Sequence, residues 1–317
     1  MGREDPLGPC GVTGVERTVE GVARRMDALG IWRKMEPYCW AIRPAGTALP
    51  YFCAVIAGDG RPVRVRFLLL EGWQTFHDYH RFRVDRFFGY YLSPMEMPHL
   101  ELVVLDAGEA KLFRHDPGYL PREANERERA LGVRLLWEAY GVMLRLEADG
   151  RLPLRYADEQ ALFSRRESAS GVWTDEPLAI PPPPPFVERI ELDRDDIRRA
   201  KDVPFAADRA VDLDLRLLPT LMTRDARPRS VYELIGVDSA TGEEFIRKRA
   251  SVRPDGGLKG LWTGLPAAVL KSFAERGTVP GELRLLSPRV FRLLRPVCLE
   301  LPIRLSLHDR LPSLPEA

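Results

Sequence analysis

The chain has 317 residues, a formal net charge of +1 at pH 7 and 45% hydrophobic residues. This length suits two domains of ordinary size, and the near-zero charge provides no overall attraction to nucleic acid or anionic membranes. Every uninterrupted apolar run is far shorter than the roughly 20 residues of a membrane-spanning helix, so no membrane span is predicted. The N-terminal residues lack the apolar core of a secretory signal, and we expect a cytoplasmic protein.

Residues 1–180 are predicted to form an α+β domain. Apolar residues at helical spacing predict a helix that begins near Val15 and ends at Gly30. The following predicted elements are strands at Tyr38–Arg43, Tyr51–Ala57 and Val63–Leu70, a helix at Trp73–Asp85, a strand at Leu100–Leu105 and a long helix at Glu123–Glu147. The second and third strands form a hairpin, in which alternating arginines of the third strand face water.

Five consecutive prolines at 181–185 mark a boundary between two domains. Proline has no backbone N–H donor and holds the chain near the extended polyproline conformation, so the run cannot join a helix or a sheet interior. We therefore expect a short, stiff spacer. A ligand for a proline-recognising groove is the alternative interpretation.

Residues 186–317 are predicted to form an α/β domain with a mixed sheet. Its predicted elements are strands at Phe186–Leu192 and Val211–Leu217 on either side of a helix at Asp193–Lys201, a hairpin of Ser230–Val237 and Glu243–Ala250, a helix at Leu265–Arg276, a strand at Glu282–Leu286, a helix after Ser287 and a strand at Ile303–Leu307. Asp238 starts the hairpin turn and Gly242 ends it, which is ordinary turn chemistry.

From Ser230 to Leu307 the predicted order is strand, turn, strand, helix, strand, helix, strand, which resembles the ribonuclease H-like nucleases and integrases. Active members hold two divalent ions with clustered carboxylates. This segment offers Asp238 at the end of its first strand, and Ser287 stands where an integrase would have its second aspartate. We expect a domain without a metal site, with Asp238 as the one catalytic candidate.

Three further features extend over nearly the whole chain. They are Trp32 ahead of the first strands, Pro117-Gly118-Tyr119-Leu120-Pro121 before a long helix, and the Val237-Asp238…Thr241-Gly242 hairpin with Pro280 before a strand. Together they resemble an uncharacterised bacterial two-domain family, which implies architecture and a bacterial cytosolic setting but no activity. That family continues its Pro-Gly-Tyr-x-Pro motif with an aromatic residue, whereas Arg122 follows here. The residues themselves predict a turn at Pro117-Gly118, a helix start at Pro121 and a buried Tyr119.

The segment at 73–91 interleaves aromatic residues with histidines and arginines. Its candidate binding residues are Trp73, Phe76, His77, His80, Arg81 and Arg83. Aromatic faces beside arginines can stack on planar ligands or on the bases of single-stranded nucleic acids. Trp73, Phe76 and His80 also share one helical face, which is typical of core packing and is the preferred interpretation.

Histidines and cysteines predict no metal site. His77 and His80 stand three apart, but zinc normally takes three or four protein ligands, and His99, His115 and His308 are isolated in the sequence. The cysteines at 10, 39, 53 and 298 form no C-x-x-C pair, which favours free thiols in a reducing compartment. A meeting of Cys39 with Cys53 across adjacent strands stays open.

The last predicted helix, after Ser287, carries a stripe of arginines along its length. They are Arg289, Arg292 and Arg295, at intervals of three residues. Such a stripe can neutralise phosphates, although a solvated helix face is the commoner origin. The common nucleotide-binding, hydrolase and metalloprotease signatures are absent, and no cofactor is expected.

These observations favour a non-catalytic cytosolic protein that binds another protein, with a ribonuclease H-like domain that lacks a metal site. One alternative is a nucleic-acid-processing enzyme of the nuclease or integrase type that uses Asp238. Another is a small-molecule binder that uses the aromatic segment at 73–91. The sequence leaves the partner and the oligomeric state open.

Overall fold

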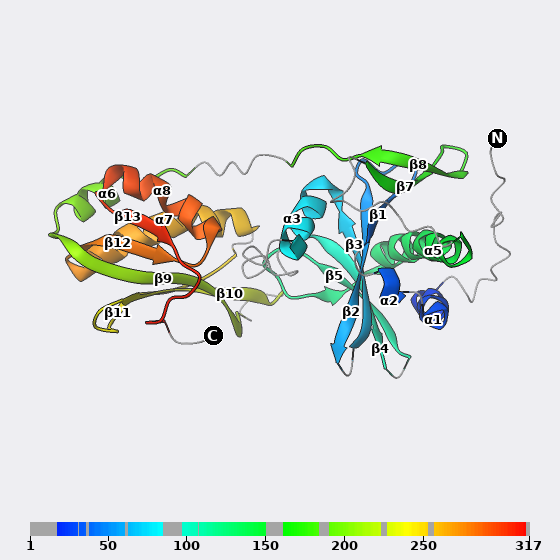
Figure 1. Cartoon of the computed structure of the whole chain (residues 1–317), viewed down its shortest axis with the longest axis horizontal. Helices are drawn as coiled ribbons and strands as arrows, with labels where there is room; N and C mark the ends of the chain where they lie inside the picture. Colours follow the sequence, from blue (N-terminus) through cyan, green and yellow to red (C-terminus); the bar gives the residue numbers. More distant parts are fainter. Residues whose placement is uncertain are drawn as a thin grey trace. The chain divides into compact units, whose positions relative to one another are not determined.

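The computed structural model describes residues 18–30, 32–35, 38–60, 63–84, 97–106, 108–149, 161–183, 190–222, 227–252 and 257–314. The chain divides into two compact units (Figure 1). Unit 1 consists of Met1–Tyr79, Met97–Asp116 and Pro121–Pro184, and unit 2 of His80–Glu96, Pro117–Leu120 and Pro185–Ala317. The boundary at Pro184 lies inside the proline run, but the two short segments that group with unit 2 were not predicted. Among the described helices, none combines the length and apolar character needed to cross a bilayer.

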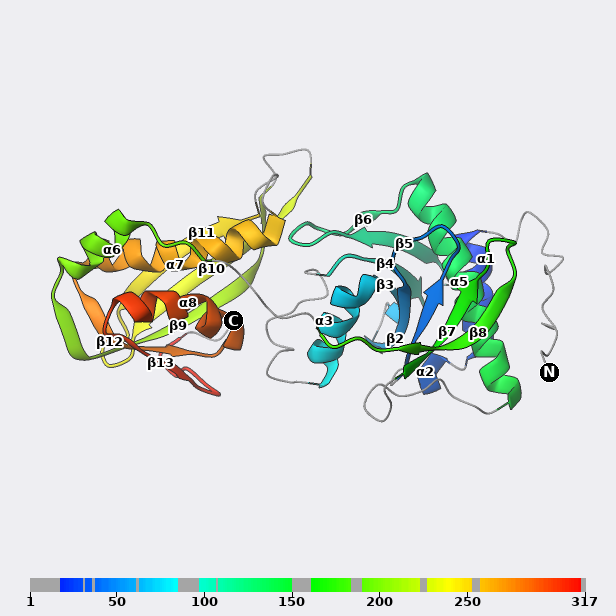
Figure 2. The same cartoon turned by 90° about the horizontal axis from the view of Figure 1, so that it is seen from above.

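Unit 1 is built on an eight-stranded mixed sheet with the order β6-β5-β4-β3-β2-β1-β7-β8 (Figure 2). The strands are β1 (Cys39–Arg43), β2 (Tyr51–Gly60), β3 (Val63–Glu71), β4 (His99–Leu105), β5 (Ala110–His115), β6 (Arg122–Glu123), β7 (Ala161–Glu167) and β8 (Trp173–Ala179). Neighbouring strands are antiparallel except for β1 and β7, which run parallel.

Helices cover both faces of this sheet. The helices α1 (Val19–Leu29), α2 (Trp32–Met35) and α5 (Glu126–Asp149) lie on one face, and α3 (Gly72–Val84) lies on the other (Figure 1). Successive residues of a strand point to opposite faces, so Phe67 packs beneath α1 and α5 while Leu68 packs beneath α3. Arg64 is exposed, as the alternation of β3 predicts.

The predicted elements of unit 1 are mostly present, with shifted ends. Helix α1 has Thr18 as its N-cap, and Gly30 ends it in the left-handed region at φ 66°. Helix α5 begins at Glu126 rather than Glu123, because Glu123 pairs with Phe113 in the sheet. The sequence prediction missed the short helix α2 and the strands β5, β6, β7 and β8.

Unit 2 contains a five-stranded mixed sheet with the order β11-β10-β9-β12-β13. The strands are β9 (Phe205–Met222), β10 (Arg229–Asp238), β11 (Glu244–Ser251), β12 (Val279–Leu285) and β13 (Arg304–Leu307). The first three are antiparallel, and the last two run parallel to β9. The helices α6 (Arg194–Lys201), α7 (Gly257–Arg276) and α8 (Pro288–Glu300) share one core with the sheet and lie on one face of it (Figure 1).

The predicted order of elements in residues 230–307 is confirmed, with β10 first and Asp238 as its last residue. The sheet begins with the long central β9, of which the sequence predicted only Val211–Leu217. The predicted strand at Phe186–Leu192 is not seen at 190–192, which have no regular structure, while 186–189 lie outside the described residues. The protein is therefore a mixed α and β protein with two mixed sheets.

The segment Pro117–Leu120 adds a short extended piece to unit 2. The Ser230 N–H donates to the Gly118 carbonyl at 2.9 Å, and the Leu120 N–H donates to the Pro228 carbonyl at 3.2 Å. Gly118 has φ 81°, and a Cβ atom there would lie 2.2 Å from Cγ1 of Val252, so only glycine fits. Tyr119 is half-buried beneath the Arg227 guanidinium instead of fully buried, and no helix starts at Pro121.

Candidate functional site

The sheet of unit 2 has one apolar face and one charged face. Along β9, Val211 and Leu213 point into the core shared with the helices, and Asp212 and Asp214 point to the opposite face. Both aspartates are nevertheless buried, with exposed fractions of 2% and 3%. The C-terminal segment covers part of this charged face, where Leu311 packs among apolar residues of β10.

Most carboxylates of the charged face have cationic partners of their own. Asp214 accepts from Arg216 at 3.0 Å and from its neighbouring backbone N–H. Glu233 accepts from Arg249 at 2.9 Å and from Arg247 at 3.1 Å, and these hydrogen bonds lower the pKa of Glu233.

Glu282, on β12, is held in the same way. It accepts from the Ser306 hydroxyl at 2.7 Å and lies 3.0 Å from Arg304. Burial by itself raises the pKa of Glu282, but these partners outweigh burial and lower the pKa. A carboxylate with a lowered pKa and a fixed partner is a structural anion rather than a general acid.

Asp212 is the exception on this face. One of its oxygens accepts from the Ser313 hydroxyl, and the other, Oδ1, is buried without a hydrogen-bond partner. No two further His, Cys, Asp or Glu side chains join Asp212 in a potential metal cluster within the described parts of the chain. One carboxylate cannot hold the pair of ions that ribonuclease H-like enzymes use.

Asp238 forms a turn, as the sequence predicts. Its Oδ1 accepts from the Ala240 and Thr241 N–H groups at 2.9 and 3.0 Å, and its Oδ2 accepts from Arg209 at 2.6 Å. Burial raises the pKa of Asp238, but the backbone donors and Arg209 outweigh burial and lower the pKa. Ser287 likewise has a structural role, because its hydroxyl accepts from the Val290 N–H at 3.2 Å and caps α8.

The aromatic segment is part of the unit 1 core as far as it is described. Phe76 and His77 have exposed fractions of 1% and 2%, and the rings of Trp73 and Phe76 pack on Phe52. These two buried side chains offer no face on which a base could stack, so their predicted binding role is not supported. His80 is half-buried. The side chains of Arg81 and Arg83 lie outside the described residues, as do residues 85–91.

The arginine stripe on α8 is only partly a solvated face. Arg292 and Arg295 are exposed, while the Arg289 guanidinium lies 5.0 Å from the centre of the Trp262 ring. Arg289 therefore packs on α7 and is not equivalent to its neighbours in the stripe.

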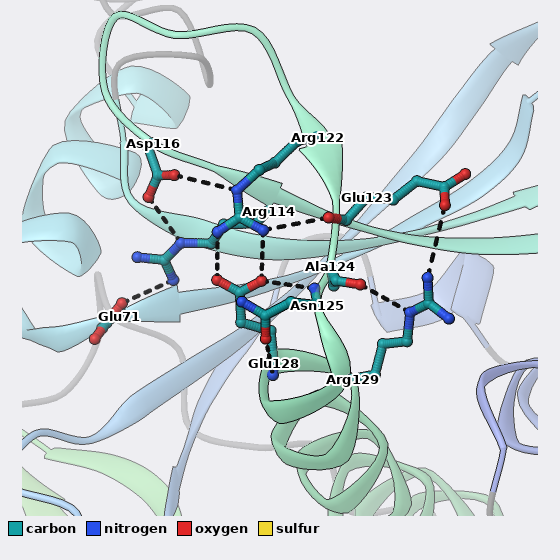
Figure 3. Close-up of polar contacts among 9 residues, drawn as sticks. All are labelled: Glu71, Arg114, Asp116, Arg122, Glu123, Ala124, Asn125, Glu128 and Arg129. Atoms are coloured by element: carbon teal, nitrogen blue, oxygen red, sulfur yellow. Dashed lines mark hydrogen bonds and ion pairs between the residues drawn. The ribbon is translucent and has the colours of Figure 1, made fainter. Parts of the chain in front are cut away.

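A polar network fixes the start of α5 (Figure 3). Asn125 and Glu128 form a reciprocal capping box, with N–H to oxygen distances of 2.9 and 3.0 Å. Arg122 donates to both oxygens of Glu128, at 2.6 and 2.7 Å, and Arg114 joins Glu71 to Asp116. The paired charges indicate a structural role, and Arg122 is the residue that departs from the Pro-Gly-Tyr-x-Pro pattern.

A buried cluster of His99, Glu101 and His115 lies on the α3 face of the unit 1 sheet. The two imidazole rings stack with centroids 4.1 Å apart, and Glu101 Oε2 lies 2.6 Å from His115 Nε2. Burial, together with the neighbouring His115, lowers the pKa of His99 to about 3, so its imidazole is neutral. His99 Nε2 and His115 Nδ1 are buried and have no hydrogen-bond partner in the part of the chain that the structure describes. Each such atom costs about 1–3 kcal/mol.

A hollow of about 1410 Å³ lies along the side of α5 that faces away from the sheet. Helix α1 and the connection between β7 and β8 flank it, and its aromatic lining residues are Trp137, Tyr140 and Trp173. Arg134 and Arg165 each lie 6.0 Å from the Trp173 ring centre, and they form ion pairs with Glu167 and Glu138 respectively.

Sequence reasoning missed the histidine cluster and this hollow. Glu101 lies in the predicted strand Leu100–Leu105, but His99 was left just outside it although β4 begins there. His115 lies on β5, a strand that was not predicted. The alternating aspartates of β9 were visible in the sequence, yet their strand was not recognised as the centre of the sheet.

Comparison with known proteins defines part of unit 2. Residues 196–317 match the model of a family described as Domain of unknown function (DUF6930). This match includes the complete five-stranded sheet with its charged face. No curated protein and no solved structure matches the chain.

Proposed function

We propose that the chain is a non-catalytic binding protein whose unit 2 is a ribonuclease H-like scaffold without a metal site. The strand order supports this fold, because three antiparallel strands precede two that run parallel to the first, with helices between the last three strands. The observation that carries the proposal is the separate pairing of Asp214, Glu233, Asp238 and Glu282 with their own arginines. Carboxylates held apart in this way cannot converge on two shared ions.

The hollow along α5 is the surface that best suits a partner. Its volume of about 1410 Å³ exceeds the ~300–1,000 Å³ of most small-molecule pockets, which favours a polypeptide segment as the occupant. Tryptophan, tyrosine and arginine, which line it, are the residue types that protein interfaces favour. Val172 lines the hollow with an exposed fraction of 58%, so apolar surface is available.

Charge favours a protein partner over a nucleic acid. Arg165 is paired with Glu138 and Asp175, and Arg134 with Glu167, so the charges of the two arginines beside Trp173 are already compensated. Phosphate binding requires Lys or Arg side chains that can replace the counterions of the phosphates. We therefore infer an occupant with apolar side chains and little net charge. Free thiols at Cys39, Cys53 and Cys298 support a reducing, cytosolic setting as part of the same proposal.

The absence of catalysis is tested by nuclease assays with Mg²⁺ and Mn²⁺ on single-stranded and double-stranded DNA and RNA. We expect the wild-type protein to be as inactive as the Asp212→Asn and Asp238→Ala variants. Metal-dependent cleavage that either substitution abolishes would overturn the proposal in favour of the nuclease alternative.

The hollow is tested by Val172→Asp, with Leu299→Asp on α8 as the matched control. Both side chains are exposed, at 58% and 86%, so both variants should fold. We expect a photo-crosslinker at Trp173 to capture one discrete protein partner in the native host, and Val172→Asp but not Leu299→Asp to abolish this capture. Equal capture by both variants would place the partner elsewhere.

A further inference from the structure

The cluster on the α3 face of unit 1 brings three potential metal ligands together. His99 and His115 are direct partners in the register of β4 and β5, and Glu101 follows two residues later on the same face of β4. One ligand atom from each residue can be chosen so that all three lie within 4.8 Å of one another. All three side chains are buried, with exposed residue fractions of 1%, 7% and 6% for His99, Glu101 and His115.

Hydrogen bonds indicate which nitrogen of each imidazole carries the hydrogen and which carries a lone pair. The Met97 carbonyl can only accept, so His99 Nδ1, at 2.8 Å, carries the hydrogen and leaves a lone pair on Nε2. The Glu101 carboxylate likewise accepts from His115 Nε2, so in the neutral imidazole of His115 the lone pair lies on Nδ1. Among the described residues neither nitrogen has a hydrogen-bond partner, and both are buried.

This arrangement has the outer contacts of a metal site. A metal-bound histidine usually donates its other N–H to a backbone carbonyl or a carboxylate, which fixes the tautomer and the ring orientation. His99 makes the first kind of contact, which it can keep when Nε2 binds a metal. The carboxylate partner of His115 is Glu101, which belongs to the cluster itself. A structural histidine pair would instead be expected to use its second nitrogens in hydrogen bonds, because buried polar atoms are rarely left unpaired.

We propose that His99, Glu101 and His115 form a binding site for a divalent first-row transition metal ion, with Zn²⁺ as the reference ion. Imidazole nitrogen suits Zn²⁺ and its neighbours, whereas Mg²⁺ and Ca²⁺ take oxygen ligands. Three protein ligands leave a further coordination position open for a small ligand. The site is separate from the α5 hollow, since the cluster packs on the opposite face of the sheet.

Binding requires a change in the ring stack. The two imidazole planes are only 15° from parallel, so lone pairs in those planes do not meet at one ion. Ligand atoms about 2.1 Å from a tetrahedral zinc ion lie about 3.4 Å apart, and rotation of the His115 ring brings its nitrogen toward the other two ligands. Metal binding is therefore expected to abolish the stack, and Glu101 to exchange its hydrogen bond for a metal contact.

The test uses the full chain after treatment with EDTA, titrated with Zn²⁺ by calorimetry and with Co²⁺ by absorption spectroscopy. We expect one ion per chain, Co²⁺ bands typical of nitrogen and oxygen ligands, and a loss of at least ~100-fold in affinity for His99→Gln and His115→Gln. Glu101→Gln should weaken binding less, because a carboxamide oxygen can still coordinate. His308→Gln in unit 2 is the matched control and should bind like the wild type.

X-ray absorption and a cysteine variant distinguish metal binding at the histidines from misfolding of a variant and from binding to thiols. If a histidine variant fails to fold by circular dichroism, X-ray absorption at the zinc edge of the wild-type protein decides, with imidazole scattering and no sulfur expected. A sulfur shell, or Co²⁺ binding that the double variant Cys39→Ser/Cys53→Ser abolishes, would assign the metal to the thiols and overturn the proposal. Absence of binding, or equal binding by all variants, would do the same and would identify the cluster as a stacked structural pair.

Discussion

Both units place ionisable side chains on one face of a sheet, but the two sets of side chains differ in their hydrogen-bond partners. In unit 2, Asp214, Glu233 and Glu282 each have arginine partners from the same or neighbouring strands. In unit 1, His99 and His115 each use one nitrogen and leave the other buried and unpaired. A satisfied network stabilises the fold it belongs to, whereas buried lone pairs without hydrogen-bond partners on neighbouring histidines indicate a missing ligand. Within the described residues, Asp212 has one oxygen without a hydrogen-bond partner and no companion ligands.

The largest effect is expected from Asp214→Ala in unit 2. Removal of the carboxylate leaves Arg216 mostly buried without this partner and removes an acceptor from the Leu215 N–H, so unfolding by urea should require about 3 kcal/mol less free energy. Asp195→Ala, at an exposed ion pair on α6, is the control and should change stability by under about 1 kcal/mol. Similar small changes in both variants would show that the charged face does not stabilise unit 2.

Zinc should stabilise unit 1 and leave unit 2 unchanged. At a free Zn²⁺ concentration of 100 times Kd, binding to the folded state adds about 2.7 kcal/mol to its unfolding free energy. Amide hydrogen exchange, read separately for β4 and β9, measures the effect in each unit. Equal protection of both strands by zinc, or protection that persists in His99→Gln, would contradict the expected difference between the two units.

The metal-free units should also differ in their response to acid. The pKa of His99 is about 3 in the folded state and near its ordinary 6.5 in the unfolded state, so the unfolded state binds the proton first and stability falls with pH below about 6.5. Unit 1 should lose about 2 kcal/mol between pH 7 and pH 5.

In unit 2 the pKa values of Glu233, Asp238 and Glu282 are lowered, so their stabilisation is present above the ordinary carboxylate range and is lost only as the pH falls through it. Urea unfolding of EDTA-treated protein, followed by hydrogen exchange at several pH values, measures both responses. Loss of unit 2 before unit 1 on acidification would reverse the expected order.

The smallest effect is expected from Arg295→Ala on α8. Arg295 is exposed, and its removal should change stability by under about 0.5 kcal/mol and leave binding to single-stranded oligonucleotides at background. Filter binding at low salt checks the second point. Oligonucleotide binding by the wild type that Arg295→Ala weakens would restore the phosphate interpretation of the stripe.

The sequence by itself determined most of the local structure. Periodicity located α1, α3 and α6 and the strands of both hairpins, because apolar spacing and capping residues act within a few positions of one another. It also identified the Asp238 turn and the Ser287 cap, whose partners are two or three residues away.

Only the tertiary structure decided which strands are neighbours and which side chains meet. The central place of β9, the pairing of Glu233 with Arg249 on the neighbouring strand, and the stacking of His99 on His115 depend on strand register between segments that no local pattern links. Pairing energy comes from contacts across strands, so a strand that is missed in the sequence hides every contact it makes. The missed β5 concealed the histidine cluster for this reason.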